Sequence, residues 1–196
     1  MSLSLLPVVE GDGEVAAVPI LLRRICQEVY GRFDVTIRHP WRLPRSKMVI
    51  PSEIARVYQV LAQGASGTGA VIVILDQDDD ADVPDLAQRV RGPMGDMAPI
   101  QVVVARREFE AWFLGGAVSL RAHRSVYDDA SFVGDPQAPR DAKGRMMTIM
   151  HERYRETLHQ PAFSQILSIE LARRRCSSFE HLVGAVGHLI ADSAGS

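Results

Sequence analysis

The stretch VVEGDGEVAAV, residues 8–18, places a glutamate at the end of an apolar run, then two glycines and the start of a helical pattern. A strand, a glycine-rich turn and a helix in this order are typical of phosphate-binding loops in parallel α/β proteins. Glu10, Asp12 and Glu14 would repel a phosphate, however, because carboxylates are ionised at neutral pH in water. The stretch therefore predicts an α/β fold and raises the question of which ligand an acidic turn binds.

Four segments have the composition of β-strands. The runs at 3–9, 70–75 and 100–105 are apolar and β-branched and end at polar or turn residues, which predicts buried strands. The segment 33–39 alternates more strongly and predicts an edge strand. We therefore expect a sheet of four strands.

Helical patterns separate these strands and continue beyond them. Between the strands they lie at 14–30, 52–63 and 84–95. After residue 106 a helix broken at Gly115-Gly116 is expected at 107–123, and further helices are expected at 142–157, 161–174 and 178–192. Alternating strands and helices predict an α/β, Rossmann-like fold with a mostly parallel sheet flanked by helices. We expect this core over residues 1–106 and a C-terminal helical extension, 107–196, packed on the same domain.

The composition is that of a globular protein. Of 196 residues 46% are hydrophobic and 23% charged, and the net charge is −2. These values exclude a nucleic-acid binder that works through bulk positive charge, but not one with a local basic groove. The two cysteines are not in a CxxC pair, and no segment resembles a signal peptide or a membrane span. We expect a cytoplasmic protein without a membrane partner.

Carboxylates follow two of the predicted strands. Glu10 ends the first, and Asp76 and Asp78 follow the run 70–75 and project to the same side of an extended segment. Parallel strands end at one edge of a sheet, so these side chains are expected to converge. Close carboxylates repel unless a cation lies among them, and oxygen ligands suit Mg²⁺ or Mn²⁺. For the acidic residues of 79–82 we favour solvated surface instead.

These motifs resemble a known family. VVEGDGE after a strand and VILDQDD further along resemble the Toprim domain, which topoisomerases, primases, recombination-mediator proteins and OLD-type nucleases share. More specifically, the chain is similar to a bacterial Toprim-like family described as a domain of unknown function. The matching segments are residues 10–25, 75–79, 107–114 and 154–179, so the resemblance spans nearly the whole chain.

The resemblance implies a Toprim-like fold and Mg²⁺-dependent chemistry. In active Toprim enzymes the strand-end glutamate and the DxD aspartates bind Mg²⁺, and these positions match Glu10, Asp76 and Asp78. The glutamate also serves in proton transfer. Glu14 matches a second acidic position of the nuclease-type members, and the family pattern favours Glu110 as a further ligand.

Two other positions leave alternatives open. Glu108 and Glu110 would share a side in an extended segment, whereas in a helix only one of them would face the site. A charge that stabilises a helix N-terminus is the alternative role for either residue. In LHQP, His159 stands where we expect an acidic residue, so a ligand from that region is missing or altered.

A phosphate substrate requires cations, which the segment 38–47, RHPWRLPRSK, offers. Trp41 is interleaved with the basic residues Arg38, His39, Arg42, Arg45 and Lys47, and such a mixture can line a nucleic-acid groove. A solvated connection with one exposed tryptophan is an equally supported alternative. Lys143 is a further candidate because the resembling family tends to keep a lysine there.

Two functions follow from these features. The first is a Mg²⁺- or Mn²⁺-dependent phosphodiesterase, a nuclease for DNA or RNA with Glu10, Asp76 and Asp78 as catalytic residues. The second is a non-catalytic module that binds nucleic acid or a protein. OLD nucleases fuse Toprim to an ATPase and this chain has no ATPase motif, so a separate ATPase partner is conceivable by analogy, as is a homo-oligomer.

Overall fold

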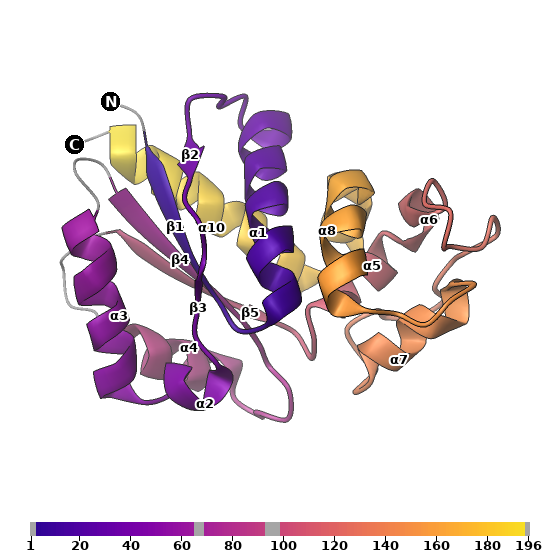
Figure 1. The fold of residues 1–196 in the computed structure, drawn as a ribbon, viewed down its shortest axis with the longest axis horizontal. Coiled ribbons are helices and arrows are strands. Elements are labelled where there is room, and N and C mark those ends of the chain that lie inside the picture. The colour runs from indigo at the N-terminus through magenta and orange to yellow at the C-terminus, as the bar shows by residue number, and fades with distance from the viewer. Residues whose placement is uncertain (1–2, 65–68, 93–98, 195–196) are drawn as a thin grey trace.

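A parallel β-sheet forms the centre of the protein, and helices cover both of its faces (Figure 1). The computed structural model describes residues 3–64, 69–92 and 99–194. The strands are β1 (Ser4–Val9), β2 (Thr36–Ile37), β3 (Trp41–Arg42), β4 (Gly69–Asp76) and β5 (Ile100–Ala105). All pairings are parallel, in the order β2-β1-β4-β5, and β3 also pairs with β1. The predicted α/β class with a mostly parallel sheet is confirmed.

The edge of the sheet differs from the prediction. The strand expected at 33–39 is shortened to β2, and a further short strand, β3, follows it outside the predicted range, which makes five strands instead of four. Ser4 pairs with Thr36 and Val8 with Trp41, so both short strands lie along the same side of β1. Pro40 lies between them and has no N–H to donate to a strand ladder, which accounts for the interruption.

Helices of the N-terminal half connect the strands. They are α1 (Asp12–Arg24), the π-helical turn η1 (Ile25–Val29), α2 (Arg45–Met48), α3 (Pro51–Gly64) and α4 (Val83–Arg91). In the C-terminal half the regular elements after β5 are helices, and residues 121–141 form a long loop. These helices are α5 (Glu110–Gly115), α6 (Ala117–Leu120), α7 (Ala142–Met146), the 3₁₀ turn η3 (Met147–Ile149), α8 (Glu156–Ile166), α9 (Ile169–Arg175) and α10 (Ser177–Ala194).

Alternate residues of each strand face different layers, as the two-residue period requires. Leu6 and Val8 of β1 pack with α3 and α4 on one face of the sheet. Leu5 and Val9 face the other layer, which contains α1 and α10 together with the buried side chains of α5, α8 and α9. The C-terminal helices therefore share one hydrophobic core with the sheet. Among the described residues, no helix combines the length and the apolar character needed to cross a membrane.

Three predicted C-terminal helices have different bounds in the structure. The helix expected at 107–123 is α5 followed by α6, with the break at Gly116. The helix expected at 142–157 ends at Ile149, because Met150 is extended and bridges to Val126. The helix expected at 161–174 is α8 followed by α9. Arg24 donates hydrogen bonds to the carbonyls of Ser164 and Leu167, which satisfies backbone acceptors where α8 ends.

Candidate functional site

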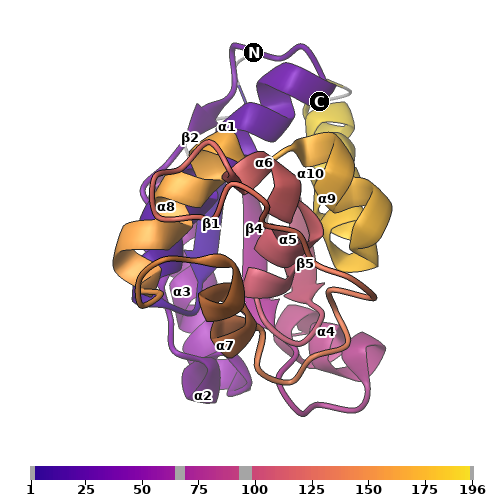
Figure 2. The ribbon, with the colours of Figure 1, turned by 90° about the vertical axis from the view of Figure 1, so that its right-hand side faces the viewer.

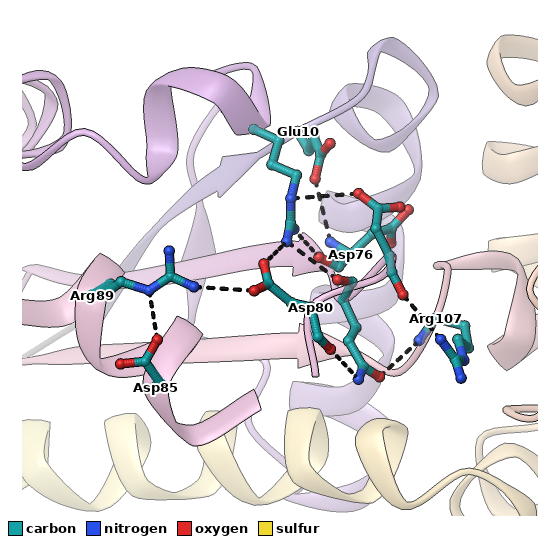
Figure 3. A network of polar contacts seen from close by, with 9 residues as sticks. Glu10, Asp76, Asp80, Asp85, Arg89 and Arg107 are labelled. Atoms are coloured by element: carbon teal, nitrogen blue, oxygen red, sulfur yellow. Dashed lines mark hydrogen bonds and ion pairs between the residues drawn. The ribbon is translucent and has the colours of Figure 1, made fainter. Parts of the chain in front are cut away.

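Two strand ends carry the first carboxylates of the site (Figure 3). Asp76 is the last residue of β4, and Glu10 directly follows β1. Glu10 Oε2 accepts the Asp76 N–H at 3.3 Å, and Asp76 Oδ1 accepts the Phe109 N–H at 2.8 Å. These bonds join the ends of β1 and β4 to the segment that leads from β5 into α5. The predicted convergence of Glu10 and Asp76 therefore follows from the parallel order of the strands.

The first turn of α1 contributes Glu14. Its side chain is 5% exposed, and its Oε2 accepts the Glu10 N–H at 3.0 Å. Gly11 is extended and precedes the helix, and a Cβ there would lie 3.2 Å from Glu14 Oε1. The turn thus folds the helix start back onto the strand end, so Glu10 and Glu14 are neighbours.

Glu110 lies at the start of α5 and is fully buried. Its Oε1 accepts hydrogen bonds from Tyr154 Oη and Gln160 Nε2, each at 3.0 Å. Its Oε2 has no hydrogen-bond partner within the described ranges. A buried carboxylate oxygen without a partner is costly unless a proton or a cation reaches it.

Burial raises the pKa of all four carboxyls, and repulsion within the group adds to this effect at Asp76 and Glu14. Desolvation raises the pKa of Asp76 well above its usual value, and the charges of Glu14, Glu110 and Glu10 raise it further. Burial also raises the pKa of Glu14, to about 7, and the pKa values of Glu10 and Glu110. Four acidic groups that are hard to ionise together form an environment that favours a cation.

Lys143, at the start of α7, is a basic residue whose charge acts on these carboxyls and lowers the pKa of Asp76 and Glu110. Although burial alone would lower its pKa, the charges of Glu110, Glu156 and Asp76 raise it. Its Nζ pairs with Glu156 Oε1 at 2.9 Å, and its backbone N–H donates to Glu108 Oε2 at 2.9 Å. Lys143 therefore stays charged and belongs to the site.

The carboxylates have the chemistry that a hard cation prefers, but their side chains are too far apart to bind one directly. Oxygen donors without sulfur or imidazole are the set that Mg²⁺ and Mn²⁺ prefer. In the part of the chain that the structure describes, however, no three His, Cys, Asp or Glu side chains stand close enough together to hold a metal ion. Direct ligation by three of them requires side-chain rotations, or the retained waters that Mg²⁺ commonly uses as bridges.

Asp78 occupies a different position from the other predicted ligands. It is exposed and adopts a left-handed backbone conformation, with φ of 51°. Its N–H donates to the Arg107 carbonyl at 2.9 Å, and its carboxylate lies 3.4 Å from Arg45 Nε. Arg107 is also left-handed, with φ of 67°. The expectation of an extended segment with Asp76 and Asp78 on one side therefore does not hold beyond Asp76.

Arg45 is engaged within the chain. Its guanidinium donates to the carbonyls of Asp76 and Gln77 and pairs with Asp80 Oδ2 at 2.5 Å. Asp80 also pairs with Arg89 at 3.2 Å, so two arginines hold the loop after β4 (Figure 3). Arg45 thereby fixes the strand end that carries Asp76.

The other predicted nucleic-acid contacts lie in different surroundings. Arg42 pairs with Asp12 at 2.8 Å, which places it beside the first turn of α1. Lys47 is exposed on α2, and Trp41 is 39% exposed at the sheet edge. His159 is fully buried, and its Nδ1 accepts the Arg155 N–H at 2.9 Å.

Sequence reasoning missed Tyr154 and Gln160 as the residues that position Glu110. Both lie in the segment 154–179 that carries the family resemblance. The motif therefore marked this segment, but it assigned no role to either residue. A Cβ on Gly13 would lie 2.3 Å from Gln160 Oε1, so α1 and α8 cross at contact distance here. This crossing brings Gln160 to the carboxylates.

Comparison with protein families matches residues 9–187 to a family described as a domain of unknown function, DUF4276. The chain belongs to this family. The DUF4276 match includes every residue of the site from Glu10 to Gln160, and it extends from the end of β1 into α10. Neither curated proteins nor solved structures gave a match.

Proposed function

We propose that this DUF4276 protein is a divalent-metal-dependent phosphodiesterase with a Toprim-like fold, a nuclease that acts on DNA or RNA. One observation carries the proposal. Glu10, Glu14, Asp76 and Glu110 come from the ends of two parallel strands and the starts of two helices, and the pKa of each is raised by burial. Such an arrangement is unfavourable for the protein alone and favourable once a cation is bound.

Glu10, Glu14, Asp76 and Glu110 would hold the cation, with Asp78 reaching it if the loop after β4 moves. Bound Mg²⁺ or Mn²⁺ supplies charge neutralisation at a phosphate oxygen and lowers the pKa of a coordinated water. The unpartnered Oε2 of Glu110 supports this assignment, because a cation would supply the partner that the oxygen lacks.

The protein's own residues have separate roles in this proposal. Glu10 is partly exposed and its pKa is raised by burial, so its carboxylate is suited to take a proton from an attacking water. Lys143 stays charged among the carboxyls and donates to a phosphate oxygen of the substrate. Tyr154 and Gln160 orient Glu110 through their hydrogen bonds.

Asp76→Asn tests the proposal. Asparagine keeps an oxygen that accepts the Phe109 N–H but removes the charge. We expect cleavage of plasmid and of labelled single-stranded oligonucleotides, in Mg²⁺ or Mn²⁺, to fall roughly 100-fold or more. In EDTA the variant should melt roughly 2–4 °C above the wild type because repulsion is relieved, and it should lose the stabilisation that Mn²⁺ gives the wild type.

Asp128→Asn is the matched control, because it removes the same charge from an exposed loop residue. It should leave both cleavage and the Mn²⁺-dependent melting shift unchanged. Wild-type cleavage that is equal in Mg²⁺ and EDTA would contradict the proposal. A Mn²⁺-dependent melting shift without any cleavage would support the non-catalytic module instead.

A further inference from the structure

A cavity of about 550 Å³ lies beside the carboxylates, at the start of α8. Residues of α7 and of the segment that leads into α8 line it, among them Lys143, Arg153, Tyr154, Arg155 and Glu156. This volume is within the range of cavities that take small ligands. Both views of the fold place α7 and α8 at the end of the sheet where β1 and β4 finish (Figures 1 and 2).

The cavity shares residues with the carboxylate site. Tyr154 contributes to its wall and donates its hydroxyl hydrogen to Glu110 Oε1 at 3.0 Å. Lys143 also lines it, and its charge lowers the pKa of Glu110 and Asp76. A ligand in the cavity is therefore adjacent to anything bound at the carboxylates.

Basic side chains outnumber acidic ones in the lining of the cavity, three to two. The acidic side chains are engaged, since Asp141 Oδ1 accepts the Gly144 N–H at 2.7 Å and Glu156 pairs with Lys143. Arg155 is exposed and approaches Glu152 only at 4.0 Å. Arg153 is exposed and makes no hydrogen bond or ion pair with residues that the structure describes. Two guanidinium groups are thus available to an anion.

The N-terminus of α8 also lies at the cavity. Arg155 precedes α8, and its side chain does not cap the helix. Glu156 and Thr157, the first residues of the helix, line the cavity together with the arginines. Backbone N–H groups at a helix start favour anions in the same way as the guanidinium groups do.

We propose that this cavity binds a phosphate group of the nucleic-acid strand next to the bond that is cleaved, through Arg153 and Arg155. The inference rests on the proposed function and deepens it by assigning the subsite for the neighbouring nucleotide. Planar guanidinium groups bind phosphate oxygens in pairs, and a volume of about 550 Å³ leaves room for part of a sugar or base.

The test compares the double variant Arg153→Gln/Arg155→Gln with the wild type in EDTA, where no cleavage occurs. Binding of a short single-stranded oligonucleotide, followed by fluorescence anisotropy, should weaken about tenfold or more. The slope of log affinity against log salt should become shallower by about 0.7, because the contact with one phosphate of a single strand is lost. Oligonucleotides with a 5′-phosphate or a 5′-hydroxyl show whether the phosphate is terminal or internal: loss confined to the phosphorylated strand indicates a terminal phosphate.

Arg56→Gln/Arg91→Gln is the matched control, with the same change of charge on α3 and α4. It should retain wild-type affinity and salt dependence. Equal losses in both double variants, or none in either, overturn the subsite. Failure of the subsite and failure of the proposed function give different results. If the wild type cleaves and the cavity variant binds normally, the subsite is wrong; if binding depends on the arginines but no metal-dependent cleavage occurs, the nuclease function is wrong.

Discussion

Glu14 shows how single residues make this site depend on pH. Burial raises its pKa in the folded protein to about 7, from 4.5. Between pH 4.5 and about 7 the folded state therefore holds a proton that the unfolded chain has released. Between these values stability falls as pH rises, because the folded state binds more protons. The contribution is fully present below about pH 4.5 and is lost as pH rises through about 7.

We therefore expect the free energy of unfolding in EDTA to decrease across this window by up to about 3 kcal/mol from Glu14 alone. Glu14→Gln keeps the acceptor for the Glu10 N–H and should remove that part of the decrease. Urea denaturation between pH 4.5 and 7.5 measures it, with Asp128→Asn as the unaffected control. An unchanged profile in Glu14→Gln would contradict the raised pKa of this carboxyl.

At this scale the sequence predicts some positions of the site and not others. Glu10 and Asp76 follow buried strands, so parallel topology is enough to bring them together. Asp78 and Arg45 are different, because a left-handed backbone and a guanidinium bonded to two carbonyls depend on contacts between distant segments. Charge patterns along the chain carry no information about such contacts.

At the scale of elements, α10 offers a controlled comparison of two glycines. A Cβ on Gly184 meets open space, whereas a Cβ on Gly187 would lie 2.5 Å from Tyr30 Oη. Tyr30 follows η1, and its hydroxyl donates to the Val183 carbonyl at 2.8 Å. The two positions thus differ in packing but share one helix.

Gly184→Ala should stabilise the protein by about 0.5–1 kcal/mol, because alanine is the better helix former. Gly187→Ala should destabilise it by about 1–3 kcal/mol, because the methyl group displaces the Tyr30 ring. Urea unfolding of both variants measures the difference. Equal shifts of the same sign would mean that Tyr30 does not pack against this face.

Elements with a strong local pattern were the predictable ones. The β-branched runs at 70–75 and 100–105 are β4 and β5, which begin and end within one residue of the prediction. The segment 142–157 failed because Met150 pairs with Val126, a bridge between distant residues that helical propensity does not register. The helix expected from residue 161 begins at Glu156 instead, and Pro161 lies inside it.

At the scale of the whole molecule, one layer of the core is built from both halves of the chain. The side chains of β4 and β5 that face this layer pack with residues of α10, which include Phe179, Leu182 and Leu189. A chain that ends at residue 106 would expose this face of the sheet to water.

We therefore expect the full chain to unfold in a single transition and the chain of residues 1–106 to lack one. Circular dichroism during heating, together with gel filtration and dye binding to exposed apolar surface, distinguishes the two. A cooperative transition in the shorter chain would show that the N-terminal half folds alone.

The interrupted edge of the sheet has a consequence for self-association. A long, regular edge strand presents a row of backbone groups to which another copy can add a strand, which leads to aggregation. Here β2 and β3 are two residues each, with a proline between them. This side of the sheet therefore cannot be extended by a continuous strand from a second copy, and self-association by strand addition is disfavoured at this edge.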